Sequence, residues 1–495
     1  MADDKRGAGA QHKILNLAWL PHYRESDPKR PHTKLVKPVD LVQADVTAGF
    51  LTPNGVTRDP KLQGLVDEVL LKENPELKQF NFALTDLSRV VDPKKDKPKY
   101  AGHNDLVPQF GASLLKIVVM YAAYQLQYDL NVMAQKNPTW DSAKLFEEAR
   151  AAWADTQVPV KGAAVEAVRP GDPGKFKRQN KLIQISGSPL PLQLGSWNPN
   201  FRPNKFHGAP NLEMIFGTDP SPIGDRGVTF LQKTAGFSQS AIDSYLDDTK
   251  HKPQELISAN LPFSERLFLM ADVSDNSAAW SCAFDVGFLY IHSVAWQADL
   301  FNPQRGGGPT LTLPYGAPQW KEGAVLGGAQ HSTAIAMAAL MTLIVTDGIV
   351  SPTACDQMKW LLNKHKDSSA KVGNWMDIMA KAGTSGTFSP VEFSLNMGFA
   401  GNRFKWKNGT TITPTQVFPD KVLSKLGLFI VDAEKPTERH LESDCAYVER
   451  KVGARTLKYV ISFLNWELEP NPAGPKGIIR QRLIAGLDKC VQENT

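Results

Sequence analysis

The chain has 495 residues, of which 42% are hydrophobic, 22% charged and 9% aromatic, and its 56 basic and 51 acidic residues leave a net charge of +5. This composition is typical of a soluble globular protein, and the length allows a large core or more than one domain. The charge is too small to indicate a nucleic-acid partner, and no nucleic-acid-binding motif accompanies the basic clusters, so none is expected.

The N-terminal part predicts an irregular extension, a helix and a hairpin. Residues 1–58 are rich in proline and charge and show little periodicity, so we expect an irregular extension before a domain at 59–495. Asp59 followed by proline predicts a helix start. The stretch FNFALTDL at 80–87 alternates as a strand does, and KYAGHN at 99–104 is expected to return beside it.

Residues 110–124, FGASLLKIVVMYAAY, have apolar residues at helical spacing but contain a serine and a lysine. Ser113 is expected to open a helix, with Lys116 one turn further on the same face. Burial favours the neutral amine, which is a candidate base for the hydroxyl, and the helix N-terminus offers N–H groups to an oxyanion. The alternative is that Ser113 caps the helix and Lys116 snorkels to the surface.

The same serine-lysine spacing occurs a second time, at Ser368 and Lys371. This copy lies in the polar stretch HKDSSAKVG, with no apolar helix behind it. We interpret it as a solvated loop and a chance match of a short motif.

The middle of the chain predicts helices around one long insertion. A helix is expected at 141–154, and the Pro/Gly-rich region 157–250 is interpreted as an insertion packed over the core. Helical patterning returns at 264–297 and is interrupted by Ser-Asp-Asn. Ser332 is expected to cap a further helix, and 351–364 supplies one more.

The C-terminal part predicts three strands, at 421–432, 445–451 and 457–466, with a hairpin turn at 452–455 joining the last two. The chain would therefore begin and end with strands around a helical middle. This order of elements indicates an α+β fold.

Several function classes lack support in the sequence. The four cysteines are far apart and form no C-x-x-C, and H-E-x-x-H, Walker and G-x-G-x-x-G motifs are absent, so no metal and no cofactor are expected. The N-terminus has no apolar leader segment, and the longest apolar run, 334–345, is too short for a membrane span. We expect a cytoplasmic protein as the sequence is written, or a periplasmic one if a leader has been removed.

Three short motifs follow one another along the chain: S-L-L-K from Ser113, S-D-N from Ser274 and a later K-x-G. S-x-x-K, S-D-N and K-T-G together are the signature of class A β-lactamases and penicillin-binding proteins. Over roughly residues 60–485 the sequence resembles this serine-dependent superfamily. The resemblance implies an antiparallel sheet of about five strands built from both chain ends, flanked by helices, with an all-helical subdomain besides the insertion.

The third motif has two candidates. Lys381, in K-A-G-T, keeps a hydroxyl after the glycine but follows a helix-like segment. Lys425, in K-L-G-L, lies in a predicted strand that a hairpin follows, which agrees with the topology of the family. We favour Lys425, and either lysine could instead be an exposed charge.

The resemblance implies a role for each residue. Ser113 would be the nucleophile that forms an acyl-enzyme, and Lys116 the base that removes its proton. Ser274 would pass protons to the leaving group, Asn276 would hold Lys116 and the substrate amide, and Lys425 would keep the site positive. The substrate-binding part would be Gly427 and Leu428, with the N–H groups of Ser113 and Leu428 forming the oxyanion hole.

Two departures from the family pattern affect the expected substrate. In K-L-G-L, Leu426 and Leu428 replace hydroxyls that usually bind a substrate carboxylate, which favours neutral or hydrophobic acyl groups. Residues 298–330 contain no E-x-x-L-N, and Glu322 is the nearest acid, so fast β-lactam hydrolysis is not expected.

The leading hypothesis is therefore a serine hydrolase that acts by acyl transfer on a small-molecule or peptide ester or amide. One alternative is a true β-lactamase or D-alanyl-D-alanine peptidase. Another is a binding or structural protein that kept the scaffold and lost turnover. The sequence gives no indication of the oligomeric state.

Overall fold

The computed structural model describes a little under half of the chain. The described residues are 58–91, 96–107, 109–137, 139–154, 210, 212–216, 263–287, 290–291, 294–295, 298, 300, 309–311, 330–363, 403–413, 420–430, 440–468 and 475–495. The expected extension, up to residue 57, lies outside this part, as does nearly all of the expected insertion. The second serine-lysine pair, which is Ser368 and Lys371, lies outside it as well. So do Lys381 and Glu322.

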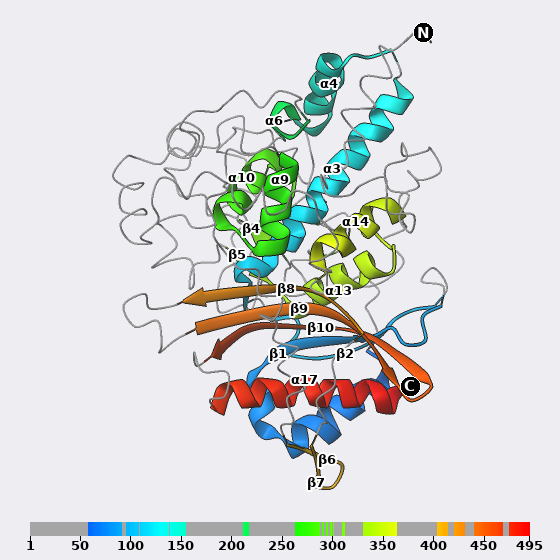
Figure 1. Ribbon diagram of the computed structural model, residues 1–495, viewed down its shortest axis with the longest axis vertical. Helices are drawn as coiled ribbons and strands as arrows, with labels where there is room; N and C mark the ends of the chain where they lie inside the picture. Colours follow the sequence, from blue (N-terminus) through cyan, green and yellow to red (C-terminus); the bar gives the residue numbers. More distant parts are fainter. Residues whose placement is uncertain are drawn as a thin grey trace, which may run out of the picture.

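A five-stranded antiparallel sheet crosses the middle of the molecule, in the strand order β2-β1-β10-β9-β8 (Figure 1). The strands are β1 (Asn81–Asp86), β2 (Lys99–His103), β8 (Lys421–Ile430), β9 (His440–Val452) and β10 (Arg455–Leu468). Strands from the two ends of the chain meet where β1 pairs with β10. The predicted sheet, including its origin from both chain ends, is confirmed.

The two faces of the sheet bury different side chains, because successive residues of a strand point to opposite sides. Leu423 and Tyr447 belong to the core on the side of α3 and α13, whereas Val422 and Val448 belong to the core on the side of α17. Both faces are therefore covered, and the sheet lies between two layers of helices.

Most helices lie on one side of the sheet (Figure 1). They are η5 (3-10, Ala112–Leu115), α3 (Lys116–Lys136), α4 (Ser142–Ala154), α6 (Leu212–Phe216), α9 (Phe263–Phe268), η8 (a π-helix, Leu269–Val273), α10 (Asn276–Val286), α13 (Ala334–Val345) and α14 (Pro352–Leu362). In the described residues, no helix is both long and apolar enough to cross a membrane.

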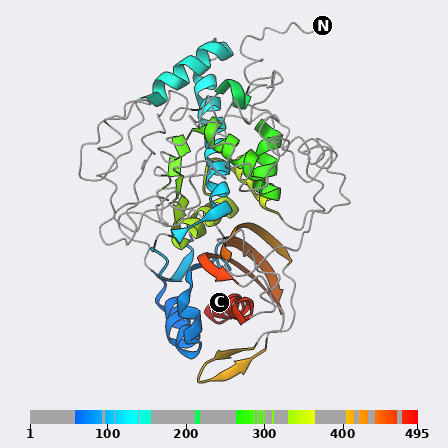
Figure 2. The ribbon, with the colours of Figure 1, turned by 90° about the vertical axis from the view of Figure 1, so that its left-hand side faces the viewer.

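The opposite side of the sheet is covered by both ends of the described chain, as the side view shows (Figure 2). Its elements are α2 (Pro60–Gly64), η3 (a π-helix, Leu65–Leu71), η4 (3-10, Pro75–Gln79) and α17 (Pro475–Asn494). Two small sheets complete the fold: β3 (Gln109–Phe110), β5 (Gln330–Ser332) and β4 (Thr310–Leu311) form one, and β6 (Phe404–Trp406) and β7 (Thr410–Ile412) form the other.

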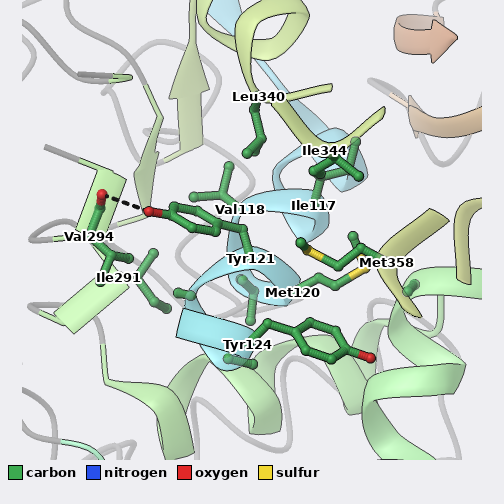
Figure 3. Close-up of a cluster of buried hydrophobic side chains, with 14 of the residues drawn as sticks. Ile117, Val118, Met120, Tyr121, Tyr124, Ile291, Val294, Leu340, Ile344 and Met358 are labelled. Atoms are coloured by element: carbon green, nitrogen blue, oxygen red, sulfur yellow. Dashed lines mark hydrogen bonds between the residues drawn. The ribbon is translucent and has the colours of Figure 1, made fainter. Parts of the chain in front are cut away.

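Helix α3 lies at the centre of the core on the side of the sheet that carries most of the helices. Its residues are buried on all sides for its first three turns, among them Val118, Met120 and Tyr124. Figure 3 shows Val118 beside Leu340 of α13, Met120 beside Met358 of α14, and the Tyr121 hydroxyl donating to the backbone carbonyl of Val294 at 3.2 Å. The long apolar run predicted from the sequence is thus a helix enclosed by other helices.

Two expectations about individual elements are corrected, and a third is confirmed. The chain does not end in strands, because the 20-residue helix α17 follows β10. The helix at 334 is capped by Thr333, whose hydroxyl accepts from the Ala336 N–H at 3.3 Å, while Ser332 belongs to β5. The 264–297 pattern is helical on both sides of Ser-Asp-Asn, as predicted: α9 and the π-helix η8 precede the break, and α10, which ends at Val286 with Gly287 as its C-cap, follows it.

Candidate active site

The turn that carries Ser113 joins strand β3 to helix α3. Ser113 lies in the 3-10 turn η5, and the α-helix begins at Lys116, one turn later than the sequence predicted. The Lys116 N–H donates to the Ser113 carbonyl, so the two residues are adjacent along the turn. Ala112, directly before Ser113, has φ +44°, a strained value for a residue with a Cβ. Ser113 is half-buried and therefore open to a small substrate.

Lys116 is fully buried, and its amine meets the Ser-Asp-Asn corner. Its Nζ lies 2.6 Å from the Ser274 carbonyl oxygen, 3.1 Å from the Ser274 Oγ and 2.7 Å from the Asn276 Oδ1. An ammonium has three N–H donors, and three acceptors are present. The structure thus brings the Lys116 amine together with Ser274 and Asn276.

The Ser-Asp-Asn corner is formed by the backbone conformation of Ser274 and by the helix cap at Asp275. Ser274 ends the π-helix η8 in the left-handed conformation, with φ +64°. Asp275 then starts α10, and its carboxylate accepts from the Ala278 N–H at 2.7 Å as an N-cap. The backbone reversal at Ser274 turns its carbonyl away from the helix ladder, which makes that oxygen available to Lys116.

Burial and charge act on the Lys116 amine in opposite directions. Burial lowers its pKa to about 7, and the carboxylate of Asp275 opposes this shift. Near neutral pH a large fraction of the amine is therefore uncharged. An uncharged amine has a lone pair and can accept a proton.

Strand β8 approaches the Ser113 turn at Gly427. A Cβ on Gly427 would lie 2.7 Å from the Gly111 carbonyl oxygen, 2.8 Å from the Leu114 nitrogen and 2.9 Å from the Ser113 nitrogen. Only a glycine permits this contact, because backbone atoms cannot move aside as a flexible side chain can. The K-x-G at 425–427 thus lies directly against the turn that carries Ser113.

Lys425 lies on the face of β8 that Gly427 turns toward Ser113, since residues two apart on a strand share a face. It is 2% exposed, and its Nζ donates to the Leu426 carbonyl at 3.2 Å. Leu428 continues β8 and pairs with Glu442, and its side chain lies outside the described part of the structure. The competing Lys381 is outside it too.

Ser113, Lys116, Ser274, Asn276 and Gly427 are brought together from three distant segments of the sequence. Two further contributors were not assigned a role from the sequence. Asp275 acts on the charge of Lys116, and its place inside S-D-N was the available signal. The strained backbone of Ala112 had no signal, because alanine does not mark a positive φ. Among the described residues, no cluster of three or more His, Cys, Asp or Glu is placed to hold a metal ion.

Comparison with known proteins gives matches only among solved structures. No family model and no curated protein matches the sequence. A β-lactamase from Burkholderia ambifaria matches with 11% identity over 84% of this chain and 98% of that chain, at a TM-score of 0.36. A β-lactamase from Xanthomonas campestris pv. campestris matches with 13% identity over 85% and 94%, at 0.34.

A mutant of the last common ancestor of the class A β-lactamase of Gram-negative bacteria matches with 13% identity over 85% and 97%, at a TM-score of 0.35. At these identities and TM-scores the role of each residue has to be argued from the contacts of the site itself.

Proposed function

We propose that this protein is a serine hydrolase that acts by acyl transfer through an acyl-enzyme on Ser113. The observation that carries the proposal is the buried Lys116 amine, one turn from Ser113, with a depressed pKa and with the Ser274 hydroxyl 3.1 Å away. A buried neutral amine beside a hydroxyl is the arrangement that activates a serine without a histidine.

In the first step, the neutral Lys116 amine takes the proton of the Ser113 hydroxyl, and the Ser113 Oγ attacks the carbonyl carbon of an ester or amide. The oxyanion would be stabilised by the N–H groups of Ser113 and of Leu428, the residue that follows Gly427 on β8. The bond to the leaving group then breaks, and Ser274 passes the proton from Lys116 to that group. Water releases the acyl group and restores the serine.

The K-L-G-L strand sets the class of substrate. Leu426 is half-buried on β8 next to Lys425, and together with Leu428 it offers no hydroxyl to a carboxylate. A substrate carboxylate there would lose two hydrogen bonds, at about 1–3 kcal/mol each if they are not replaced. Neutral or apolar acyl groups therefore suit the site better than an anionic peptide or β-lactam.

The test is covalent labelling with a fluorescent penicillin and with a fluorophosphonate, followed by intact-protein mass. We expect a stoichiometric adduct in the native chain and in Ser368→Ala, the matched control from the second serine-lysine pair, and none in Ser113→Ala. An adduct that persists in Ser113→Ala would refute the proposal. If the native chain reacts with neither probe, the chain is a binding or structural protein on this scaffold.

A further inference from the structure

The two helices that meet at the Ser-Asp-Asn corner are also joined at their far ends by a buried ion pair. Arg266 of α9 places its NH1 2.7 Å from the Asp285 Oδ2 of α10, with side chains only 1% and 5% exposed. The same NH1 donates to the Ser281 Oγ at 3.0 Å, and that hydroxyl donates to the Ala278 carbonyl. One guanidinium thus holds two points of α10.

The guanidinium is fixed from a further side by its own helix. It lies over the ring of Phe263, 5.3 Å from the ring centroid. Its Nε and NH2 are buried and have no hydrogen-bond partner among the described residues. An ion pair with this desolvation cost contributes little net stability, but it permits only one placement of the two helices.

The position of this pair connects it to the site. Arg266 lies about two helical turns before Ser274, and Asp285 lies a similar distance after Asn276. The two oxygens nearest to the Lys116 amine come from opposite sides of the corner, since Ser274 ends η8 and Asn276 begins α10. Any change in the angle between the helices therefore changes both distances to Nζ.

We propose that Arg266 is a positioning residue of the active site, which holds the Ser-Asp-Asn corner against Lys116 through its ion pair with Asp285. Arg266 touches neither Lys116 nor Ser113, so it acts through the corner. The inference builds on the proposed function, in which Lys116 is the base. It predicts that loss of Arg266 changes the chemistry of the Lys116 amine as well as the stability of the fold.

A second buried ion pair in the chain provides the matched control. Arg450 of β9 donates through Nε to the Asp488 Oδ1 of α17 at 2.7 Å and through NH2 to the other oxygen, with side chains 8% and 5% exposed. This pair lies between the sheet and α17, on the side of the sheet away from Lys116. Arg450→Met removes the guanidinium partner of a buried aspartate, as Arg266→Met does, although Asp488 keeps its hydrogen bonds from Tyr459 and Gln492. The change leaves the corner untouched.

The experiment compares Arg266→Met, Arg266→Lys and Arg450→Met at a temperature where urea titration finds all three folded. The first readout is the rate of Lys116 acetylation by acetic anhydride as a function of pH, followed by peptide mass, which needs no enzymatic turnover. Besides burial, the group that acts on this midpoint is the Asp275 carboxylate, which raises it. The second readout is the rate of acylation by the fluorescent penicillin and the fluorophosphonate.

We expect Arg266→Met to raise the acetylation midpoint by about one pH unit or more, because water reaches the amine and relieves the burial that lowers its pKa. Acylation should slow by about tenfold or more, with partial recovery in Arg266→Lys. Arg450→Met should match the native chain in both readouts. Equal midpoints and rates in the two methionine variants would overturn the inference.

Two further outcomes remain informative. If Arg266→Met does not fold, the double variant Arg266→Met/Asp285→Leu replaces the whole pair by apolar side chains, which a core commonly tolerates. The double variant should also show the raised midpoint, and a native midpoint would refute the role of Arg266. If the native chain is not acylated by either probe, the proposed function fails, while the acetylation midpoint still tests the positioning role.

Discussion

Replacement of Gly427 by alanine tests the contact between strand β8 and the nucleophile turn. The added Cβ would lie 2.7–2.9 Å from three backbone atoms, those of Gly111, Ser113 and Leu114. Ordinary van der Waals contact begins at 3.4 Å, so the strand and the turn must separate by roughly 0.5–0.7 Å. The Leu114 N–H already closes the turn on the Gly111 carbonyl at 3.0 Å, which keeps these atoms from moving singly.

The expected magnitude follows from this displacement. Overpacking of a rigid site costs about 1–3 kcal/mol, so the free energy of unfolding should fall by that amount. A misplacement of reacting groups of about 1 Å lowers a rate by about 100-fold, so a shift of half that size should slow acylation of Ser113 by about tenfold or more. Both losses should appear in Gly427→Ala because they have one cause.

The assay combines urea unfolding with the rate of adduct formation, and Gly453→Ala is the control. Gly453 has φ +60° and open space around it, in the β9–β10 turn remote from the site. Alanine there costs about 1–2 kcal/mol through backbone strain alone, and the acylation rate should be unchanged. If Gly427→Ala kept native stability and a native rate, β8 would not lie against the turn and the assignment of Lys425 to the site would fail.

Three further predictions concern the groups around the amine. Because the pKa of Lys116 is about 7 in the folded protein and 10.5 ordinarily, the unfolded chain binds the proton more tightly between these pH values. Stability of the native chain relative to Lys116→Met should therefore rise by about 4 kcal/mol from pH 6.5 to 10.5 in urea titrations, and a flat difference would contradict this. Asn276→Ala, which removes an acceptor, should lower the pH midpoint of acylation, and Asn276→Asp should raise it; shifts of one sign would exclude the contact. Ala112→Gly should change the free energy of unfolding by less than about 1 kcal/mol but slow acylation, because the turn gains freedom; an unchanged rate would show that its strain has no role.

The core of the site was predictable because its residues stand in short, local motifs. The serine and lysine of S-x-x-K share one helical turn, and S-D-N coincides with a break between two helices. Each motif could therefore be recognised from its local sequence. The contact between these two motifs, which are about 160 residues apart in the sequence, was expected only from the order of the motifs along the chain. Hydrophobic periodicity gives no information on it. The observed contacts of Lys116 with Ser274 and Asn276 agree with that expectation.

Helix α17 was missed because its local signal is weak. Two glycines lower its helix propensity, at about 1 kcal/mol each relative to alanine. It is stabilised instead by tertiary contacts: Leu487 and Val491 are buried against the sheet, and Asp488 accepts from Arg450 and Tyr459. Such support comes from strands distant in sequence, so no window of the sequence contains it.

The geometry of the Ser-Asp-Asn corner could not be predicted from the sequence either. An apolar run such as LFLMADV predicts an α-helix, whereas residues 269–273 form a π-helix that ends in a left-handed Ser274. The left-handed turn is what directs the Ser274 carbonyl to Lys116. A sequence pattern can indicate that a helix breaks, but the direction of one carbonyl depends on the packing of η8 against α3 and α10.

Three features at this site work against the stability of the fold. Lys116 is buried with a depressed pKa, Ala112 has a positive φ, and Ser274 adopts the left-handed conformation that favours glycine. A protein that served only as a scaffold would be more stable with methionine at 116 and glycine at 112, because neither change needs new space. Three destabilising features around one half-buried hydroxyl are typical of an active site, where backbone strain and burial of a charged group are retained because they contribute to the reaction. This convergence favours acyl transfer at Ser113 over a binding role on the same scaffold, and it makes the pH dependence of Lys116 the measurement that separates the two.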